Sequence, residues 1–313
     1  MNLQFHKIVN DDRYRFIHEN LRPVFRKAIE KAGRKNIVFV EGYDDKVIYG
    51  ILYEEYLEEK LCFIDISFEA EKVVDSDFES TGGCEKVKQH LRNFVQYLPT
   101  DKRFSGVIDR DLKTDEIVKA ERKKPDYDGR LFIFFERYTL ENYFVEPDIL
   151  FKFLEGQSIK HKKLIALLEK GTENFEKEVI NPILTCLASI AAANLTIRHF
   201  KPSEEFLRNT TPCKENVILK AIEQKLKQPQ TQKKALSLKF LAFKKEIIEK
   251  KETQKFASAK QYLSTQLNMK LRETFEIHAS IELNNYKSEL ARILKEKGLP
   301  KDFQDLLSLI NPR

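Results

Sequence analysis

Short apolar runs alternate with stretches of helical spacing over residues 36–146. Four runs have the length and the β-branched or aromatic content of buried strands: IVFVE, LCFIDISF, FSGVID and RLFIFF. They are apolar throughout instead of alternating with polar residues, which is typical of parallel strands covered on both faces. The pattern therefore predicts an α/β fold, in which helices flank a four-stranded parallel sheet and the crossovers are right-handed.

From about residue 147 the pattern is helical only, and it predicts a mostly α-helical C-terminal domain. We expect three segments: a helical lead-in over 1–35, an α/β domain over 36–150 and a basic helical domain over 151–313. The helical stretches fall at 148–170, 173–198, 203–209, 214–228, 232–251, 253–275 and 279–297. The apolar run Ile183 to Ile197 is shorter than a bilayer and contains Thr, Ser and Asn, so we interpret it as a core helix.

Three local features carry more specific expectations. Asp44 is placed to cap the helix KVIYGILYEEYLEE. Residues 111–129, DLKTDEIVKAERKKPDYDG, are expected to form a long charged loop. In the lysine-rich segment that begins KKALSLKFLAFKKEIIEKK, apolar residues are expected to face a core while the lysines face water. These apolar residues are Leu238, Leu241, Ile247 and Ile248.

Charge divides the chain unevenly. Residues 1–150 contain 25 Lys and Arg against 30 Asp and Glu, whereas residues 151–313 contain 30 against 19. An acidic first half suits cation binding, and a basic second half suits a polyanion such as a nucleic acid. The excess of basic residues in the second half is also expected if Lys-rich helices simply keep their outer faces solvated. Charge alone does not separate these two interpretations.

Cysteine usage and the N-terminal sequence bear on the compartment. Cys62, Cys84, Cys186 and Cys213 are scattered and form no CxxC pair, so zinc and a disulfide framework are not expected. The first residues, MNLQFHKIVNDDRYRF, contain no apolar core of a signal peptide. We therefore expect a cytoplasmic protein with reduced thiols and no association with a membrane.

Acidic residues follow the predicted strands. Glu41 ends the first run and Asp45 lies four residues later, Asp109 and Asp111 follow the third run, and Glu141 comes after the fourth. Ligands of open parallel sheets bind at the carboxyl ends of the strands. Carboxylates crowded there would repel each other, and a bound divalent cation is the usual compensation. Hard oxygen ligands suit Mg²⁺ or Mn²⁺, which could activate a water for attack on a phosphodiester.

Either acidic motif, Glu41 with Asp45 or Asp109 with Asp111, is common in loops when it occurs alone. The prediction of a metal site depends on the fact that both motifs directly follow apolar strand runs of the same α/β segment. Three cations lie next to the acids in sequence and are candidates for phosphate contact or transition-state stabilisation: Lys46, Arg110 and Arg137. The aromatic residues and lysines of the C-terminal half could also grip a phosphate backbone and stack a base, although a core function is expected for most of the aromatic residues.

The stretches VFVEGYDD and GVIDRD resemble the TOPRIM pattern of topoisomerases, primases and OLD nucleases. In that pattern a Glu ends the first strand and a DxD ends the third; the nuclease branch adds an acid that Asp45 matches and a Ser/Thr-x-Glu that Thr139-Leu140-Glu141 matches. The stretch FFERYTLENYFVEP is similar to a narrower group, the AriB-like effector subunits of the PARIS anti-phage system. The resemblance covers residues 36–150, about a third of the chain.

The resemblance implies a Mg²⁺-dependent nuclease in which Glu41 is a ligand or general acid/base and Asp109 and Asp111 bind metal. For the AriB-like group it further implies a toxic effector that an ABC-type ATPase partner restrains and that cleaves host tRNA as a dimer. An OLD-like DNA endonuclease and a non-catalytic subunit that docks an ATPase remain alternatives. A Rossmann-type nucleotide binder is disfavoured because the chain lacks GxGxxG and GxxxxGKS.

Overall fold

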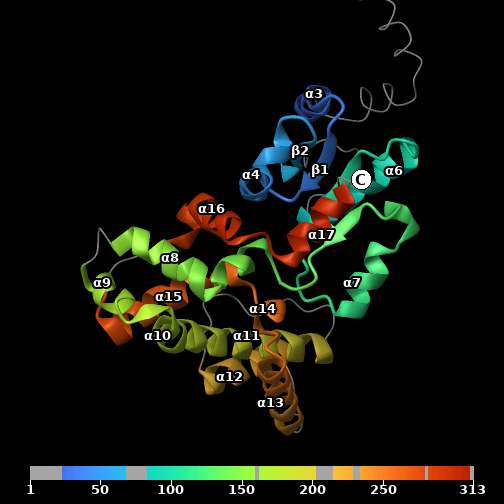
Figure 1. Ribbon diagram of the computed structural model, residues 1–313. Helices are drawn as coiled ribbons and strands as arrows, with labels where there is room; N and C mark the ends of the chain where they lie inside the picture. The colour runs from blue at the N-terminus through green and yellow to red at the C-terminus, as the bar shows by residue number, and fades with distance from the viewer. Residues whose placement is uncertain are drawn as a thin grey trace, which may run out of the picture. The chain divides into compact units, whose positions relative to one another are not determined.

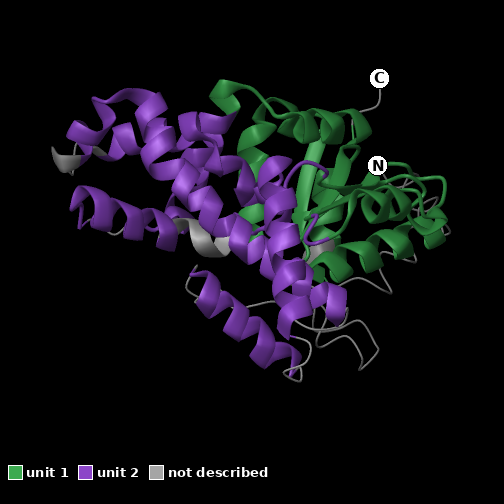
Figure 2. Cartoon of the chain, turned by 90° about the horizontal axis from the view of Figure 1, so that it is seen from below, with its two compact units in different colours: residues 1–109, 113–134, 295–313 green, residues 110–112, 135–294 purple. Residues whose placement is uncertain are grey.

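The computed structural model describes residues 23–67, 83–158, 162–201, 214–227, 233–278 and 281–310. Most of the expected helical lead-in, and the stretch expected at 203–209, lie outside these ranges. The chain divides into two compact units, coloured separately in Figure 2. Unit 1 comprises residues 1–109, 113–134 and 295–313, and unit 2 comprises residues 110–112 and 135–294. This division differs from the expected domains because the chain's last helix belongs to unit 1.

Unit 1 contains the four-stranded sheet that the sequence predicts (Figure 1). The strands are all parallel and lie in the order β2-β1-β3-β4. Their bounds are Asn36–Val40 for β1, Leu61–Asp65 for β2, Phe104–Ile108 for β3 and Leu131–Ile133 for β4. The chain is thus α/β, with helices flanking the sheet, as the continuous apolar runs require.

Helices pack on both faces of this sheet. On one face, Phe39 of β1 contacts Phe94 of α6, with ring centroids 5.2 Å apart. Its register partner Gly106 lies so close to α6 that a Cβ there would be 2.8 Å from Val87. On the other face, Phe63 stacks on Tyr49 of α4. The helices of this unit are α3 (Pro23–Ala32), α4 (Tyr43–Leu52), α5 (Glu54–Leu57), α6 (Gly83–Tyr97), α7 (Asp115–Arg122) and α17 (Lys301–Ile310).

The structure corrects two expectations about the connections in unit 1. Helix α4 begins at Tyr43, so Asp44 lies inside its first turn and is not the cap; the helix then breaks at Tyr53 before α5. Residues 111–129 are not simply a loop, because they contain α7 and a short 3-10 helix, Pro125–Tyr127. Thr114 caps α7 by accepting a hydrogen bond from Ile117, and Val118 supplies a buried face.

His90, on the buried side of α6, gives this unit a pH dependence. Burial, with a smaller contribution from the charge of Lys86, lowers the pKa of His90 from 6.5 to about 4. Between these values the unfolded chain binds a proton that the folded chain rejects, so stability falls as pH falls through this window. We expect His90→Gln to abolish about 2–3 kcal/mol of this acid destabilisation in urea titrations at pH 4.5 and 7. His278→Gln, at an exposed position, is the control. If the free energy of unfolding of His90→Gln falls between pH 7 and 4.5 as much as that of wild type, His90 is not the source of the pH dependence.

Unit 2 is helical. Its elements are η3 (Leu140–Val145), α8 (Pro147–Ser158), α9 (Lys162–Leu168), α10 (Gly171–Phe175), the π-helix η4 (Glu176–Ile180), α11 (Asn181–Phe200), α12 (Glu215–Leu226), α13 (Lys233–Glu249), α14 (Thr253–Phe256), α15 (Ala259–Phe275), η6 (Leu283–Tyr286) and α16 (Lys287–Lys297), whose end is counted in unit 1. Helix α11 is central to the packing and contacts α12, α13, α14 and α15. Among the described residues, Gly171–Phe200 is long and apolar enough to cross a membrane, but its apolar window is 67% buried, as expected for a core helix.

Two further expectations hold only in part. On α13 the buried apolar residues are Leu236, Phe240 and Ile247, whereas Leu238, Leu241 and Ile248 are exposed. Cys62 and Cys84 are reduced thiols, but Cys186 is disulfide-bonded. The thiol prediction therefore holds for two of the three described cysteines.

Candidate active site

The centre of the sheet carries the predicted acids at its carboxyl edge. Strands β1 and β3 are neighbours, and the strand order reverses between them, because β2 lies beyond β1 and β4 lies beyond β3. Glu41 follows β1 directly and Asp109 follows β3 directly. Such a reversal point is where open α/β sheets bind their ligands. The sheet topology thus places two of the predicted acids where a ligand site is expected.

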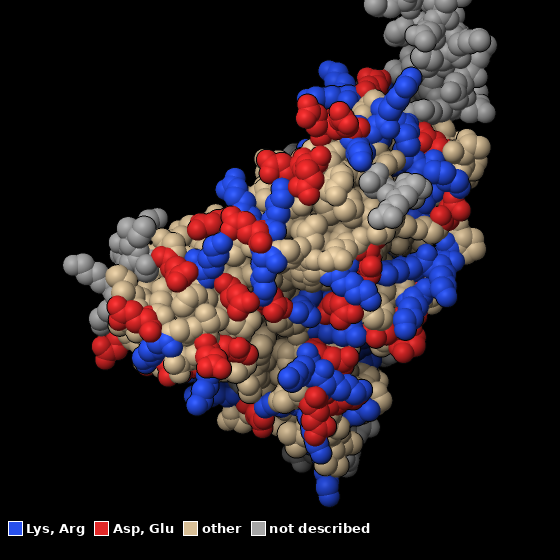
Figure 3. Space-filling view, viewed as in Figure 1, with Lys and Arg blue, Asp and Glu red and all other residues tan. Residues whose placement is uncertain are grey.

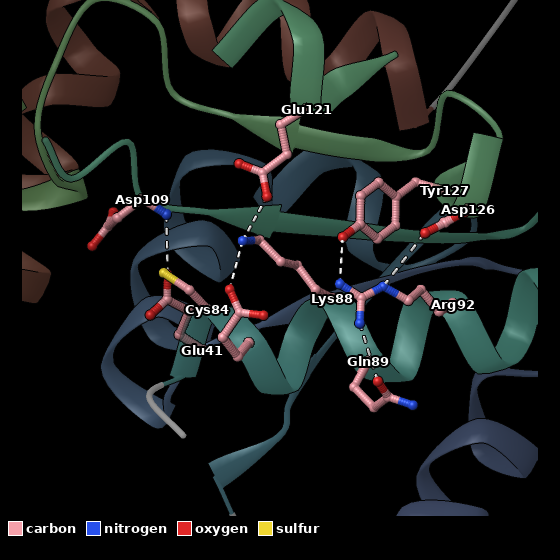
Figure 4. A network of polar contacts seen from close by, with 10 residues as sticks. Glu41, Cys84, Lys88, Gln89, Arg92, Asp109, Glu121, Asp126 and Tyr127 are labelled. Carbon is pink, nitrogen blue, oxygen red and sulfur yellow. Dashed lines mark hydrogen bonds and ion pairs between the residues drawn. The ribbon is translucent and has the colours of Figure 1, made fainter. Parts of the chain in front are cut away.

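Glu41 is held by contacts from two elements of unit 1 (Figure 4). Its Oε1 accepts a hydrogen bond from the backbone N–H of Asp109 at 3.0 Å. The same oxygen accepts a second hydrogen bond from the thiol of Cys84 at 2.9 Å, at the start of α6. The carboxylate is thereby tied both to the end of β3 and to the first turn of α6.

Asp45 lies on the same edge, in the first turn of α4. Its Oδ2 accepts a hydrogen bond from the backbone N–H of Gly42 at 3.0 Å, so part of its function is to cap the helix. One turn further on, the pKa of Tyr49 is raised well above 10, chiefly by burial and then by the negative charges of Asp45, Asp109 and Glu41. The charges of all three acids thus act on one buried phenol.

One acidic residue near this edge, Asp65, extends the predicted set. Asp65 ends β2, which stops there instead of continuing through LCFIDISF, and its Oδ2 lies 3.8 Å from Nζ of Lys46. The Lys46 side chain is 46% exposed, so an anion from solvent can reach this predicted phosphate contact. Sequence analysis missed Asp65 because we placed it inside the strand, although every strand end in such a sheet shares one edge.

Helix α6 supplies a buried cation that the sequence analysis also missed. Nζ of Lys88 lies 2.6 Å from Glu121 of α7 (Figure 4) and 2.7 Å from Glu85. Burial alone would lower the pKa of Lys88, but its hydrogen bonds to Glu121 and Glu85 outweigh burial and raise the pKa. Lys88 follows Cys84 by four residues, so both lie on one face of α6. That spacing is the only sequence signal that could have linked them.

Four of the predicted residues belong to unit 2 and are described within it. Asp111 has a left-handed backbone (φ 54°), and its N–H donates to the carbonyl of Tyr138 at 3.1 Å. Arg110 is fully buried, and its Nη1 donates to the carbonyl of Phe135 at 2.6 Å while its guanidinium lies over the rings of Phe135 and Phe256. These buried contacts indicate that Arg110 stabilises the packing of unit 2, and they do not favour the predicted phosphate contact.

Glu141 and Arg137 also make ion pairs inside unit 2. Glu141 is 5% exposed, and its Oε1 lies 3.1 Å from Nζ of Lys287. Arg137 pairs with Glu146 at 2.6 Å and lies over the ring of Tyr143. Metal binding by Glu141 and phosphate contact by Arg137 stay predictions that would require these pairs to open.

The donor chemistry of the edge fits a hard divalent cation. Glu41, Asp45 and Asp109 offer carboxylate oxygens, the ligands that Mg²⁺ and Mn²⁺ prefer. Within the described ranges, no group of three or more His, Cys, Asp or Glu side chains is arranged to hold a metal ion. Mg²⁺ keeps most of its waters and often takes only one or two carboxylates together with substrate phosphates. Glu41 and Asp109 can meet that smaller requirement.

Lysine-rich surfaces of unit 2 look solvated rather than dedicated to a polyanion. On the face drawn in Figure 3, blue and red side chains are interspersed. On and near α13, Lys244 pairs with Glu215, Lys233 with Glu223, and Lys250 with Glu246. These pairs favour the interpretation that the lysines of the basic half keep its helices solvated.

In comparisons with known proteins, no family model and no curated protein matches this chain.

Proposed function

We propose that the chain is a metal-dependent endonuclease with a TOPRIM-like active site. The observation that carries the proposal is the pair Glu41 and Asp109 at the reversal point of the sheet, tied by the 3.0 Å hydrogen bond between them. Two carboxylate residues that follow neighbouring strands at this point suit a Mg²⁺-assisted attack on a phosphodiester. The TOPRIM resemblance of VFVEGYDD and GVIDRD supports the same assignment.

The side chains of the edge divide the work between them. Glu41 and Asp109 would hold the metal, with Asp45 as a further ligand, and the metal would supply an activated water and neutralise the charge on the phosphate. Binding by Asp111 stays a prediction from the DxD resemblance. Lys46 is exposed and would contact a substrate phosphate. Because Glu41 accepts two hydrogen bonds on Oε1, its orientation is set before any substrate arrives.

Replacing Glu41 by glutamine tests the assignment, since the side chain keeps its shape and loses its charge. We expect purified wild-type chain with Mg²⁺ or Mn²⁺ to cut nucleic acid, and Glu41→Gln to lower the rate on the order of 10²–10³-fold. The exposed Glu58→Gln is the matched control and should cleave like wild type. Thermal unfolding checks that all three chains fold. Equal cleavage by Glu41→Gln, or cleavage that survives EDTA, would overturn the proposal.

The substrate and the biological setting are a finer proposal, supported by the AriB-like stretch FFERYTLENYFVEP. We infer a cytoplasmic anti-phage effector that cleaves host tRNA as a homodimer after release from an ABC-type ATPase. Sequencing of RNA ends after induction of wild type and Glu41→Gln tests this setting, with tRNA and plasmid compared in vitro. Plasmid cleavage alone would indicate an OLD-like DNA endonuclease. Absence of both cleavage and metal binding would indicate a docking subunit.

A further inference from the structure

We propose that Gly83 and Cys84, together called the α6 cradle, position the Glu41 carboxylate for catalysis. This inference rests on the proposed nuclease function, in which Glu41 binds metal. The cradle comprises the first two residues of α6, an element that no acidic motif of the sequence includes. Both residues act through Glu41 and are therefore positioning residues.

Cys84 supplies a directional contact. Its half-buried thiol donates to Oε1 of Glu41 at 2.9 Å, and the N–H of Asp109 donates to that same oxygen at 3.0 Å. A thiol is a weak donor toward neutral groups, but an ionised carboxylate strengthens the bond. Two donors from separate elements on one oxygen fix the carboxylate more tightly than either alone, because the carboxylate then cannot rotate without losing one bond.

Gly83 supplies the space for the carboxylate. A Cβ at Gly83 would lie 2.8 Å from Oε2 and 2.9 Å from Cβ of Glu41, closer than real Cβ contacts allow. The backbone of Gly83 is not left-handed, so conformation does not require glycine there. Close approach to Glu41 is the reason. Since one of these contacts is to Cβ of Glu41, rotation of the carboxylate alone cannot relieve the clash.

The two residues thus act on the two oxygens of one carboxylate: Cys84 bonds Oε1, and Gly83 packs against Oε2. A catalytic ligand needs its geometry held within about 0.5 Å, which packing and outer hydrogen bonds provide. Replacement of such supporting partners of metal ligands typically costs 10–100-fold in affinity or activity.

Substitutions at Cys84 separate positioning from packing. We expect Cys84→Ala to lower kcat about 10–100-fold and to weaken Mn²⁺ binding measured by electron paramagnetic resonance. Cys84→Ser keeps a donor and should recover most of both losses. The control is Cys62→Ala, which removes the half-buried thiol of β2. Equal kcat and Mn²⁺ affinity in Cys84→Ala and Cys62→Ala would overturn the inference. An inactive wild type would overturn the nuclease proposal itself.

Gly83→Ala and a spectroscopic measurement keep the test independent of activity. The Raman S–H stretching band of Cys84, isolated as the difference between wild type and Cys84→Ala, reports its hydrogen bond to Glu41. We expect this band to move to higher frequency in Glu41→Gln and in Gly83→Ala, because both weaken the bond. Gly83→Ala should also lose Mn²⁺ affinity. A band that stays fixed in both variants would show that the cradle does not hold Glu41, whatever the wild-type activity.

Discussion

Replacement of Lys88 by methionine is expected to lower the free energy of unfolding by about 3–5 kcal/mol, the usual cost of breaking a buried ion pair. The Lys88 side chain is 7% exposed and that of its partner Glu121 is 10% exposed, with 2.6 Å between Nζ and Oε1. Methionine fills a similar volume but leaves the Glu121 carboxylate nearly buried without its cation. The second partner, Glu85, is half exposed, so solvent compensates for most of its loss.

The pH dependence of this contribution has a definite sign. The hydrogen bonds that outweigh burial raise the pKa of folded Lys88 above 10.5, so the stabilisation is fully present below pH 10.5 and is lost only as pH rises through the folded pKa. Urea unfolding at pH 7.5 therefore measures the full stabilisation from the Lys88 ion pair.

Two control variants test whether burial causes this effect. Lys102→Met breaks an exposed pair with Asp128 and should cost under about 1 kcal/mol.

The second control removes both charges of the buried pair. Lys88→Met combined with Glu121→Leu should be substantially more stable than Lys88→Met alone, because no buried charge remains unpaired. If Lys88→Met costs as little as Lys102→Met, or if the double variant is no better than the single one, the pair is not a buried electrostatic anchor of α6 against α7.

The sheet and its central acids could be predicted because both follow from short-range patterns. A continuous apolar run bounded by turn residues has few folded alternatives, and parallel strands bring their carboxyl ends to one edge. Glu41 and Asp109 were identified in this way, and their hydrogen bond is the consequence. Cys84 and Lys88 could not be identified, because which face of α6 meets that edge depends on tertiary packing.

Helix α13 shows why burial was mispredicted in the helical half. Leu236, Phe240 and Ile247 form one apolar stripe at helical spacing, and Leu238, Leu241 and Ile248 form another. Periodicity predicts the helix from either stripe but does not say which one packs on α11.

Arg110 illustrates the same limit at the candidate site. Its position between two acids suggested a group that meets substrate, yet it is fully buried and donates to Phe135. Proximity in sequence does not determine exposure.

Asn142→Ala is expected to destabilise unit 2 by about 3–5 kcal/mol, because it removes four hydrogen bonds at once, three of them buried. Nδ2 donates to the carbonyls of Gln254 at 2.9 Å and Ala257 at 2.7 Å. Oδ1 accepts from the hydroxyl of Thr139 at 2.9 Å and from the N–H of Ala259 at 3.0 Å. Asn142 is 0% exposed, so the groups left behind would lose their partners away from bulk water.

The measurement should be local as well as global, because the chain has two compact units and a single unfolding midpoint can miss one of them. Hydrogen exchange at the Ala259 amide should accelerate in Asn142→Ala, alongside the loss in urea unfolding. The exposed Asn174→Ala, which removes one hydrogen bond to Lys170, is the control and should change neither by much. An unchanged exchange rate at the Ala259 amide would contradict the prediction.

Asn142 lies in the stretch FFERYTLENYFVEP, which resembles the AriB-like effectors, and its hydrogen bonds hold the turn that carries Glu141. Part of what that stretch encodes is therefore structural, so activity lost in its variants is evidence of catalysis only when the Ala259 amide stays protected.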